Sequence, residues 1–181
     1  AFSLRDPPAA IAAARPDAVL ACGPHGREVA LFRALARLLP GGLLGGVSPG
    51  LAAFPELLGG DPEGFIAPVQ WHPELGTSPE LGPSSPEMLA DARAAGGGEL
   101  DYVAAQAYAV ALVATRCLEL DPRDPLRAAR CLRTSTFFGA FELGPESGLQ
   151  RGHRLAVIRW KRGRRHLLAG RVAGSSGCRA A

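Results

Sequence analysis

Three short loops in the sequence carry side chains that can recognise a small polar molecule. They are Gly23-Pro24-His25-Gly26, Ser48-Pro49-Gly50 and Val69-Gln70-Trp71-His72-Pro73. Each loop combines glycine or proline, which shapes the backbone, with a side chain that can donate or accept a hydrogen bond or stack on a ring. The chemistry that these residues indicate is ligand binding.

Each of these residues also has a purely structural interpretation. His25 stands at a predicted helix start, where its ring either contacts a ligand or satisfies backbone donors. Ser48 precedes Pro49, so its hydroxyl either caps a helix or contacts a ligand. Trp71 either stacks on a ligand or covers a hydrophobic core. The sequence pattern leaves these alternatives open.

Motifs for catalysis and cofactor binding are missing from the sequence. It has no GxGxxG after the first apolar run, no GxSxG and no Walker loop. His25 and Glu28 lie three residues apart at a helix start, which is a common arrangement without chemistry. We therefore expect a protein that is not an enzyme and that uses no cofactor and no metal.

The four cysteines show neither CxxC spacing nor Cys/His ligand spacing, which argues against a zinc site or a redox dithiol. Cys117 and Cys131 fall on consecutive predicted helices, and they either pair in an oxidising compartment or are two buried free thiols. The remaining two are Cys22 and Cys178.

Strands and helices that alternate along the chain position the three loops. Short apolar runs at 18–22, 43–47 and 64–69 predict strands, and the first run is typical of a parallel strand covered on both faces. Apolar residues at helical spacing predict an amphipathic helix over 27–39, and a short helix is expected over 49–58. This order predicts an α/β fold with a parallel sheet.

The order of these elements also predicts where the loops lie. Connections in an open parallel sheet are right-handed, and ligands bind outside the carboxyl ends of the strands. We expect the strands around Val19 and Gly45 to be adjacent and parallel. We also expect His25, Ser48 and Trp71 to line a single cleft.

The composition changes beyond this unit. Residues 74–85 are rich in Pro, Gly, Ser and Thr and predict a surface crossing. A long helix is expected over 102–120, a shorter one over 124–133, and two or three strands over 137–168. Turns are expected at Gly144-Pro145 and Lys161-Arg162-Gly163, and the residues expected to pack are Tyr102, Tyr108, Phe137, Phe138 and Phe141.

The formal net charge is +3, but nine Lys and Arg residues follow Glu146 with no acid after it. The basic segment alternates Leu155, Val157 and Trp160 with charge, which predicts a half-buried hairpin with a solvated basic face. The alternative is a face that binds nucleic acid or an anionic surface. Gly, Pro or charge breaks every apolar run, so no membrane-spanning segment is expected. The first residues show no initiator Met and no secretory signal, which is compatible with a fragment.

Five sequence blocks follow one another in an informative order. They are PDAVLACGPHGREVALFRALARLLP, DPEGFIAPVQWHPE, DYVAAQAYAVALV, TFFGAFEL and GHRLAVIRW. This order, over nearly all of residues 6–168, resembles the carboxyl-terminal half of the type I periplasmic binding proteins. The closest subgroup is the branched-chain amino-acid and amide receptors of ABC importers. Members have two α/β lobes, joined by three crossings, that trap a ligand between them.

The resemblance implies a domain organisation. Residues 1–71 correspond to the α/β unit of the second lobe, and 72–140 to a crossing and the returning part of the first lobe. Residues 141–170 correspond to strands that rejoin the second lobe, and 171–181 to a disordered tail. The start of the first lobe, which helps to bind the ligand carboxylate in the family, has no counterpart in the chain.

The resemblance also implies the site residues. His25 and Pro24 match the ligand-facing loop after the first strand of this lobe, and Gln70 and Trp71 stand at an interlobe crossing. Ser48 occupies the position where amino-acid receptors carry an acid that meets the ligand ammonium. Because the acid is missing there, an amide-like or otherwise modified ligand is favoured over a plain amino acid.

The function that the resemblance implies is solute binding for an ABC importer, with an amino acid or short amide as ligand and the permease subunits as partners. Neither nucleic-acid binding nor direct membrane insertion is expected, and the implied location is periplasmic or otherwise extracytoplasmic. Two alternatives remain open, a sensor module of a regulatory system and a truncated, non-binding gene product.

Overall fold

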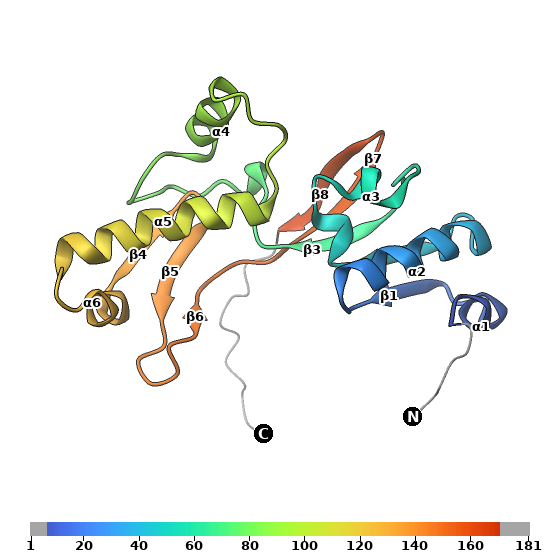
Figure 1. Ribbon diagram of the computed structural model, residues 1–181, viewed down its shortest axis with the longest axis horizontal. Helices are drawn as coiled ribbons and strands as arrows, with labels where there is room; N and C mark the ends of the chain where they lie inside the picture. Colours follow the sequence, from blue (N-terminus) through green and yellow to red (C-terminus); the bar gives the residue numbers. More distant parts are fainter. Residues whose placement is uncertain (1–6, 171–181) are drawn as a thin grey trace. The chain divides into compact units, whose positions relative to one another are not determined.

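The structure is a computed structural model that describes residues 7–170, and the chain folds into two compact units. Among the described residues, the first unit contains 7–69 and 157–169, and the second contains 70–156 and Gly170. The expected tail at 171–181 and Cys178 lie outside the described residues. Figure 1 labels the helices and strands of both units.

The first unit is an α/β layer built on a five-stranded sheet with the order β1-β2-β3-β7-β8. Strands β1 and β2 are parallel, with Val19 opposite Leu44 and Leu20 opposite Gly45, and β2 and β3 are also parallel. The predicted parallel pairing is therefore confirmed. The elements are α1 (Pro7–Ala14), β1 (Ala18–Ala21), α2 (His25–Leu38), β2 (Leu43–Gly46), the 3-10 helix η1 (Ser48–Gly50), α3 (Phe54–Leu58), β3 (Ile66–Val69), β7 (Ala156–Lys161) and β8 (Arg164–Gly170).

Aromatic rings form the core of the first unit. Helix α2 carries Phe32, whose ring meets Phe65 edge to face with centroids 5.3 Å apart. Phe54 lies 5.1 Å from Phe65 and 6.4 Å from Trp160, so the cluster joins α2, α3 and the strand β7. The Trp160 indole Nε1 donates a buried hydrogen bond of 2.6 Å to the Pro49 carbonyl. The hydrogen bond to Pro49 therefore holds the loop that follows β2 against the aromatic core.

Strand β1 is not covered on both faces, contrary to the sequence-based expectation. It stands at the edge of the sheet, and its residues alternate between exposed and half-buried. The Leu20 side chain is 74% exposed. A wholly apolar run cannot by itself distinguish an edge strand from a central one, because the distinction depends on neighbours that are distant in sequence.

Strands β7 and β8 form the predicted basic hairpin, with a turn at Arg162 and Gly163 that both have positive φ. In β7 the buried side chains alternate with exposed ones, and Ile158 and Trp160 are buried. Leu155 and Val157 were expected on the apolar face but are 58% and 39% exposed. Since the side-chain period of a strand is two, Val157 cannot share a face with Trp160.

The second unit combines helices with a three-stranded antiparallel sheet of order β4-β5-β6. The long helix α5 has the predicted bounds, 102–120. An additional helix, α4, was not expected. It begins at the last residue of the polar stretch 74–85, with a capping box in which Ser84 and Glu87 bond reciprocally. The elements are η2 (Pro73–Leu75), α4 (Ser85–Ala94), α5 (Tyr102–Leu120), α6 (Pro125–Cys131), β4 (Arg133–Thr136), β5 (Gly139–Leu143) and β6 (Gln150–Arg151).

The core of the second unit is built around Trp71 and Phe137, whose ring centroids are 5.9 Å apart. Met88, Ala105 and Ala109 complete it. The expected packing of Phe137 is confirmed, and Tyr108 contacts the same ring at 5.7 Å. The free thiols in the described part of the chain are Cys22, Cys117 and Cys131; Cys117 is buried as expected, whereas Cys131 is exposed.

Helix α5 corrects one sequence-based expectation. By length and composition it is long and apolar enough to cross a membrane. Gly and Pro do not interrupt residues 102–120, and the charges come only at Arg116 and Glu119. The helix buries Ala105, Ala109 and Cys117 in the second unit, while Val110 and Leu118 are 59% and 52% exposed.

Candidate functional site

The loops that follow β1 and β2 bring two of the predicted site residues into contact. Strand β1 ends at Ala21 and α2 begins at His25, while β2 ends at Gly46 and η1 begins at Ser48. Because the two strands are parallel neighbours, both loops leave the same edge of the sheet. The His25 Nδ1 atom lies 2.8 Å from the Ser48 Oγ atom, within hydrogen-bond distance.

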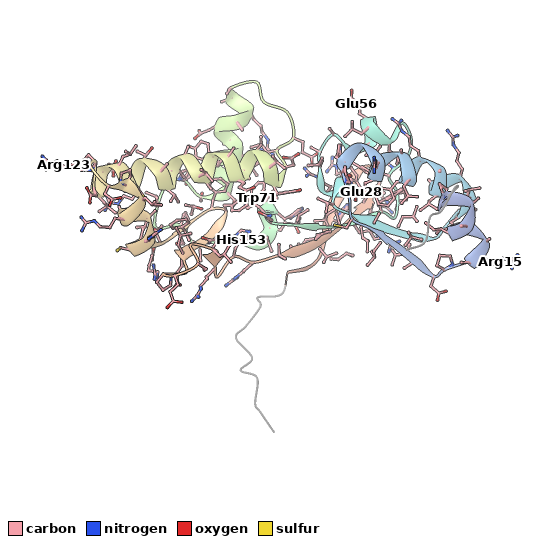
Figure 2. All side chains as sticks on the ribbon, turned by 60° about the horizontal axis from the view of Figure 1, so that its bottom comes forward. Arg15, Glu28, Glu56, Trp71, Arg123 and His153 are labelled. Carbon is pink, nitrogen blue, oxygen red and sulfur yellow. The ribbon has the colours of Figure 1, made fainter. Side chains whose placement is uncertain are left out.

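A third residue, Glu28, completes this cluster. Its side chain is 3% exposed and lies on the first turn of α2. Glu28 Oε1 accepts a hydrogen bond from the Ser48 backbone N–H at 3.2 Å, and Oε2 accepts one from the Ser48 hydroxyl at 3.0 Å. Figure 2 labels Glu28 within the first unit. We call Glu28, Ser48 and His25 the loop cluster.

The contacts settle one structural alternative for Ser48. The N-cap residue of η1 is Val47 and not Ser48, and the Ser48 hydroxyl donates to Glu28. Ser48 itself is 1% exposed, so only the exposed His25 ring carries the cluster to the surface. Pro24 is the exposed N-cap residue of α2, and its carbonyl accepts bonds from the backbone N–H groups of Arg27 and Glu28.

The spacing of His25 and Glu28 was interpreted as an arrangement without chemistry, but the sequence contains a second signal for Glu28. Positions 28, 32 and 35 share one side of a helix, and Phe32 and Leu35 are fully buried there. An acid on the apolar side of an amphipathic helix is unusual, since burial of an unpaired carboxylate is costly. The position of Glu28 on that side, rather than its spacing from His25, was the informative feature.

Gly46, the last residue of β2, makes room for the Glu28 carboxylate. A Cβ atom on residue 46 would collide with Glu28 Oε1, and it would lie 2.8 Å from the Ala21 carbonyl and 2.9 Å from Phe32 Cζ. We expect Gly46→Ala to lower the free energy of unfolding by about 1–3 kcal/mol, as overpacking does. Denaturant titration measures this loss.

Gly60→Ala is the matched control, because a Cβ there meets nothing within 4 Å. It should leave the unfolding midpoint within experimental error of the parent chain. Equal stability of the two variants would show that residue 46 is not tightly packed against Glu28.

Gln70 and Trp71 belong to the second unit. Trp71 is 3% exposed and lies in the core of that unit, as the core-covering alternative predicted. Gln70 is half-buried and lines a cavity. A single cleft that contains these residues together with His25 and Ser48 stays a prediction.

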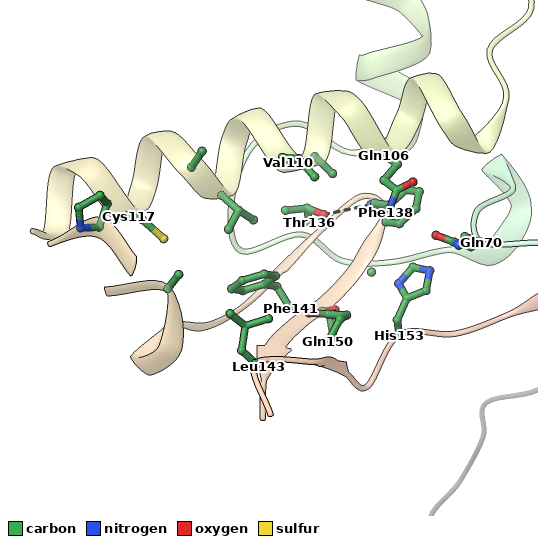
Figure 3. Close-up of a pocket in the computed structure, with 18 of the residues that line it drawn as sticks. Gln70, Gln106, Val110, Cys117, Thr136, Phe138, Phe141, Leu143, Gln150 and His153 are labelled. Carbon is green, nitrogen blue, oxygen red and sulfur yellow. Dashed lines mark hydrogen bonds between the residues drawn. The ribbon is translucent and has the colours of Figure 1, made fainter. Parts of the chain in front are cut away.

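The second unit contains a cavity of about 960 Å³ with predominantly apolar walls. Residues of α5, α6 and the β4-β5-β6 sheet line it, and Gln70, Gln106 and His153 gather near one another in Figure 3. The His153 ring stacks on Phe138, with centroids 4.7 Å apart and planes 16° from parallel. Its buried Nε2 has no hydrogen-bond partner among the described residues.

Burial lowers the pKa of His153 below its ordinary value of 6.5, and a hydrogen bond with the Gln70 backbone opposes that shift. Folding therefore favours the neutral ring. The contribution of this shift to the free energy of unfolding is fully present above the pKa that His153 has in the unfolded chain. It is lost as the pH falls through the lowered pKa of the folded chain. We expect the unfolding free energy to decrease as the pH falls below about 6.5.

The measurement is denaturant titration across that pH range for the parent chain and for His153→Phe. The variant should lose part of the acid dependence. His166→Phe, at an exposed position of β8, should retain it. Identical pH profiles for the parent and His153→Phe would contradict the assignment of this dependence to His153.

Comparison with known proteins assigns the fold. No protein-family model matches the chain, and no curated protein is similar to it in sequence. Among solved structures, it is similar to a leucine-binding protein from Thermotoga maritima, with a TM-score of 0.73, 17% identity, and coverage of 90% of this chain and 47% of that one.

Two further solved structures agree. A solute-binding protein of an ABC transporter from R. palustris, in complex with benzoate, gives a TM-score of 0.70 at 16% identity and covers 94% of this chain and 47% of that one. An ABC transporter substrate-binding protein from Aeropyrum pernix gives 0.65 at 18% identity, over 93% and 48% of the two chains. The chain therefore has the fold of the type I periplasmic binding proteins, as the sequence blocks predicted. It spans about half the length of these solved structures.

Proposed function

We propose that the chain is part of a solute-binding protein of an ABC importer and that it takes up an amino acid or a short amide outside the cytoplasm. The observation that carries this proposal is the loop cluster, which occupies the carboxyl edge of parallel strands in a type I fold. In open α/β sheets this edge is where ligands bind. The role is binding rather than bond chemistry.

On this proposal, the first unit corresponds to the second lobe of such a receptor and the second unit to the returning part of the first lobe. His25 and Pro24 contact the solute, Ser48 supports His25, and Gln70 and Trp71 belong to the crossing between lobes. Uptake would require closure of two lobes around the solute and docking on permease subunits. Differential affinity of the closed state would drive that closure.

The apolar side of the second unit fits the same proposal. Helix α5 and α6 expose Val110, Leu118 and Leu126, the last of them 61% exposed. A soluble monomer rarely leaves a large contiguous apolar surface uncovered. We propose that further elements of a longer receptor, the counterpart of the remaining half of the matched solved structures, cover this side.

Thermal unfolding in the presence of solutes tests the function. A bound solute raises the unfolding midpoint by mass action, so L-leucine, L-leucinamide and benzoate are added in separate series. At least one of them should stabilise the parent chain, and His25→Ala should abolish that effect. The matched control is Arg37→Ala, in the last turn of α2, which should preserve it. Equal stabilisation of both variants would place the solute elsewhere.

A further inference from the structure

The direction of each hydrogen bond in the loop cluster follows from elementary chemistry. A carboxylate only accepts hydrogen bonds, so the Ser48 hydroxyl donates its single proton to Glu28 Oε2 at 3.0 Å. The Ser48 oxygen has no second proton to offer. The 2.8 Å contact with His25 must therefore be donated by the Nδ1–H group of the imidazole and accepted by Ser48 Oγ.

This direction fixes the chemical character of the outer edge of His25. A neutral imidazole with its proton on Nδ1 carries a lone pair on Nε2. The ring is exposed, and no described residue forms a hydrogen bond with Nε2. The outer edge of the cluster is thus a hydrogen-bond acceptor that is available to a ligand.

The buried position of Glu28 lowers the free energy of unfolding, which indicates that the residue serves a function. The carboxyl group is buried, and the ion pairs among the described residues include no partner for it. Its compensation comes from the backbone N–H and hydroxyl of one residue, Ser48. A buried acid without a cationic partner generally destabilises a fold relative to an apolar side chain of similar size.

We propose that Glu28 is a positioning residue that acts through Ser48 to hold His25 with its proton on Nδ1, so that the site selects solutes that offer an N–H donor over those that offer only acceptors. This inference rests on the proposed function, because it requires that His25 contacts the solute. The inference also places an acid, Glu28, at this edge of the sheet. Position 48, where amino-acid receptors carry an acid, is a serine in this chain. The ligand class is an amide or an amine.

The first arm of the test uses no ligand. In ¹⁵N-labelled chain at a pH where His25 is neutral, long-range ¹H–¹⁵N spectra distinguish protonated from unprotonated ring nitrogens, and His25→Gln assigns the signals. The parent chain should show the proton on Nδ1. Ser48→Ala should lose this preference and Ser48→Thr, which keeps the hydroxyl, should retain it.

Glu28→Gln completes this arm, because a Gln amide can donate to Ser48 Oγ and so release its hydroxyl to donate to Nδ1. The Nδ1–H population should fall in this variant while the backbone amide spectrum shows a folded chain. A proton on Nε2 in the parent chain would overturn the inference. A tautomer that is unchanged in both Glu28→Gln and Ser48→Ala would also overturn it.

The second arm compares benzamide with benzoate, which have nearly the same shape but differ in the presence of N–H donors. Benzamide should shift the His25 Nε2 resonance at lower concentration than benzoate, and Glu28→Gln should reduce the difference between them. An equal or stronger response to benzoate would overturn the selectivity. If the tautomer is as inferred but none of benzamide, benzoate and L-leucinamide perturbs His25, then the proposed function fails while the positioning of His25 by Glu28 stands.

Discussion

Replacement of Phe32 by alanine is expected to lower the free energy of unfolding of the first unit by about 3–5 kcal/mol. The Phe32 side chain is fully buried and meets both Phe54 and Phe65 edge to face. Its removal leaves a cavity that the sheet and α3 can refill only in part. The loss is large relative to the roughly 5–15 kcal/mol by which native domains are stable.

The matched control is Leu20→Ala on the edge strand β1, since that side chain is 74% exposed. Its effect should stay within about 0.5 kcal/mol. Urea titration followed by tryptophan fluorescence, to which Trp160 of the first unit contributes, measures the stability of both variants. A loss below about 1 kcal/mol for Phe32→Ala would contradict the assignment of the aromatic cluster as the core.

The second large effect is expected on association. Val110, Leu118 and Leu126 are each more than half exposed, and they lie on α5 and α6 beside the apolar cavity. We expect the purified chain to self-associate through this surface and to bind apolar dyes. The combined substitution Val110→Glu and Leu118→Glu should shift the chain towards monomer in analytical ultracentrifugation and should weaken dye binding.

Glu119→Gln on the same helix is the control, because it alters charge at an exposed position without changing the apolar surface. It should leave the association state of the parent chain unchanged. A parent chain that remains a monomer at all concentrations, with no dye binding, would show that this surface does not drive association.

The sequence predicted the elements whose apolar patterns are local. The parallel pair β1 and β2 and the bounds of α5 follow from short apolar runs and from helix-compatible residues that end before Asp121-Pro122. Helix α4 was missed because its capping box joins Ser84, inside the polar stretch 74–85, to Glu87 just beyond it. The exposed edge position of β1 could not be predicted, because sheet order depends on β3 and β7.

The candidate site was predicted in part for the same physical reason. Parallel strands place their loops together, so the proximity of His25 and Ser48 followed from topology. The role of Glu28 depends on the space above Gly46 and on the direction of an inward-facing side chain, which only the folded structure defines. Sequence spacing therefore identified two members of the loop cluster and missed the residue that organises them.

The most direct test of solute binding at the loop cluster is an NMR titration of the purified chain with L-leucine, L-leucinamide and benzoate. We predict amide shifts at residues 23–28 and 46–50 with at least one solute. Because one exposed edge cannot bury the solute as two closed lobes do, the Kd should be weak, on the order of millimolar. Shifts that map to other parts of the chain, or the absence of shifts with all three solutes, would contradict the account. So would a submicromolar Kd for this chain alone.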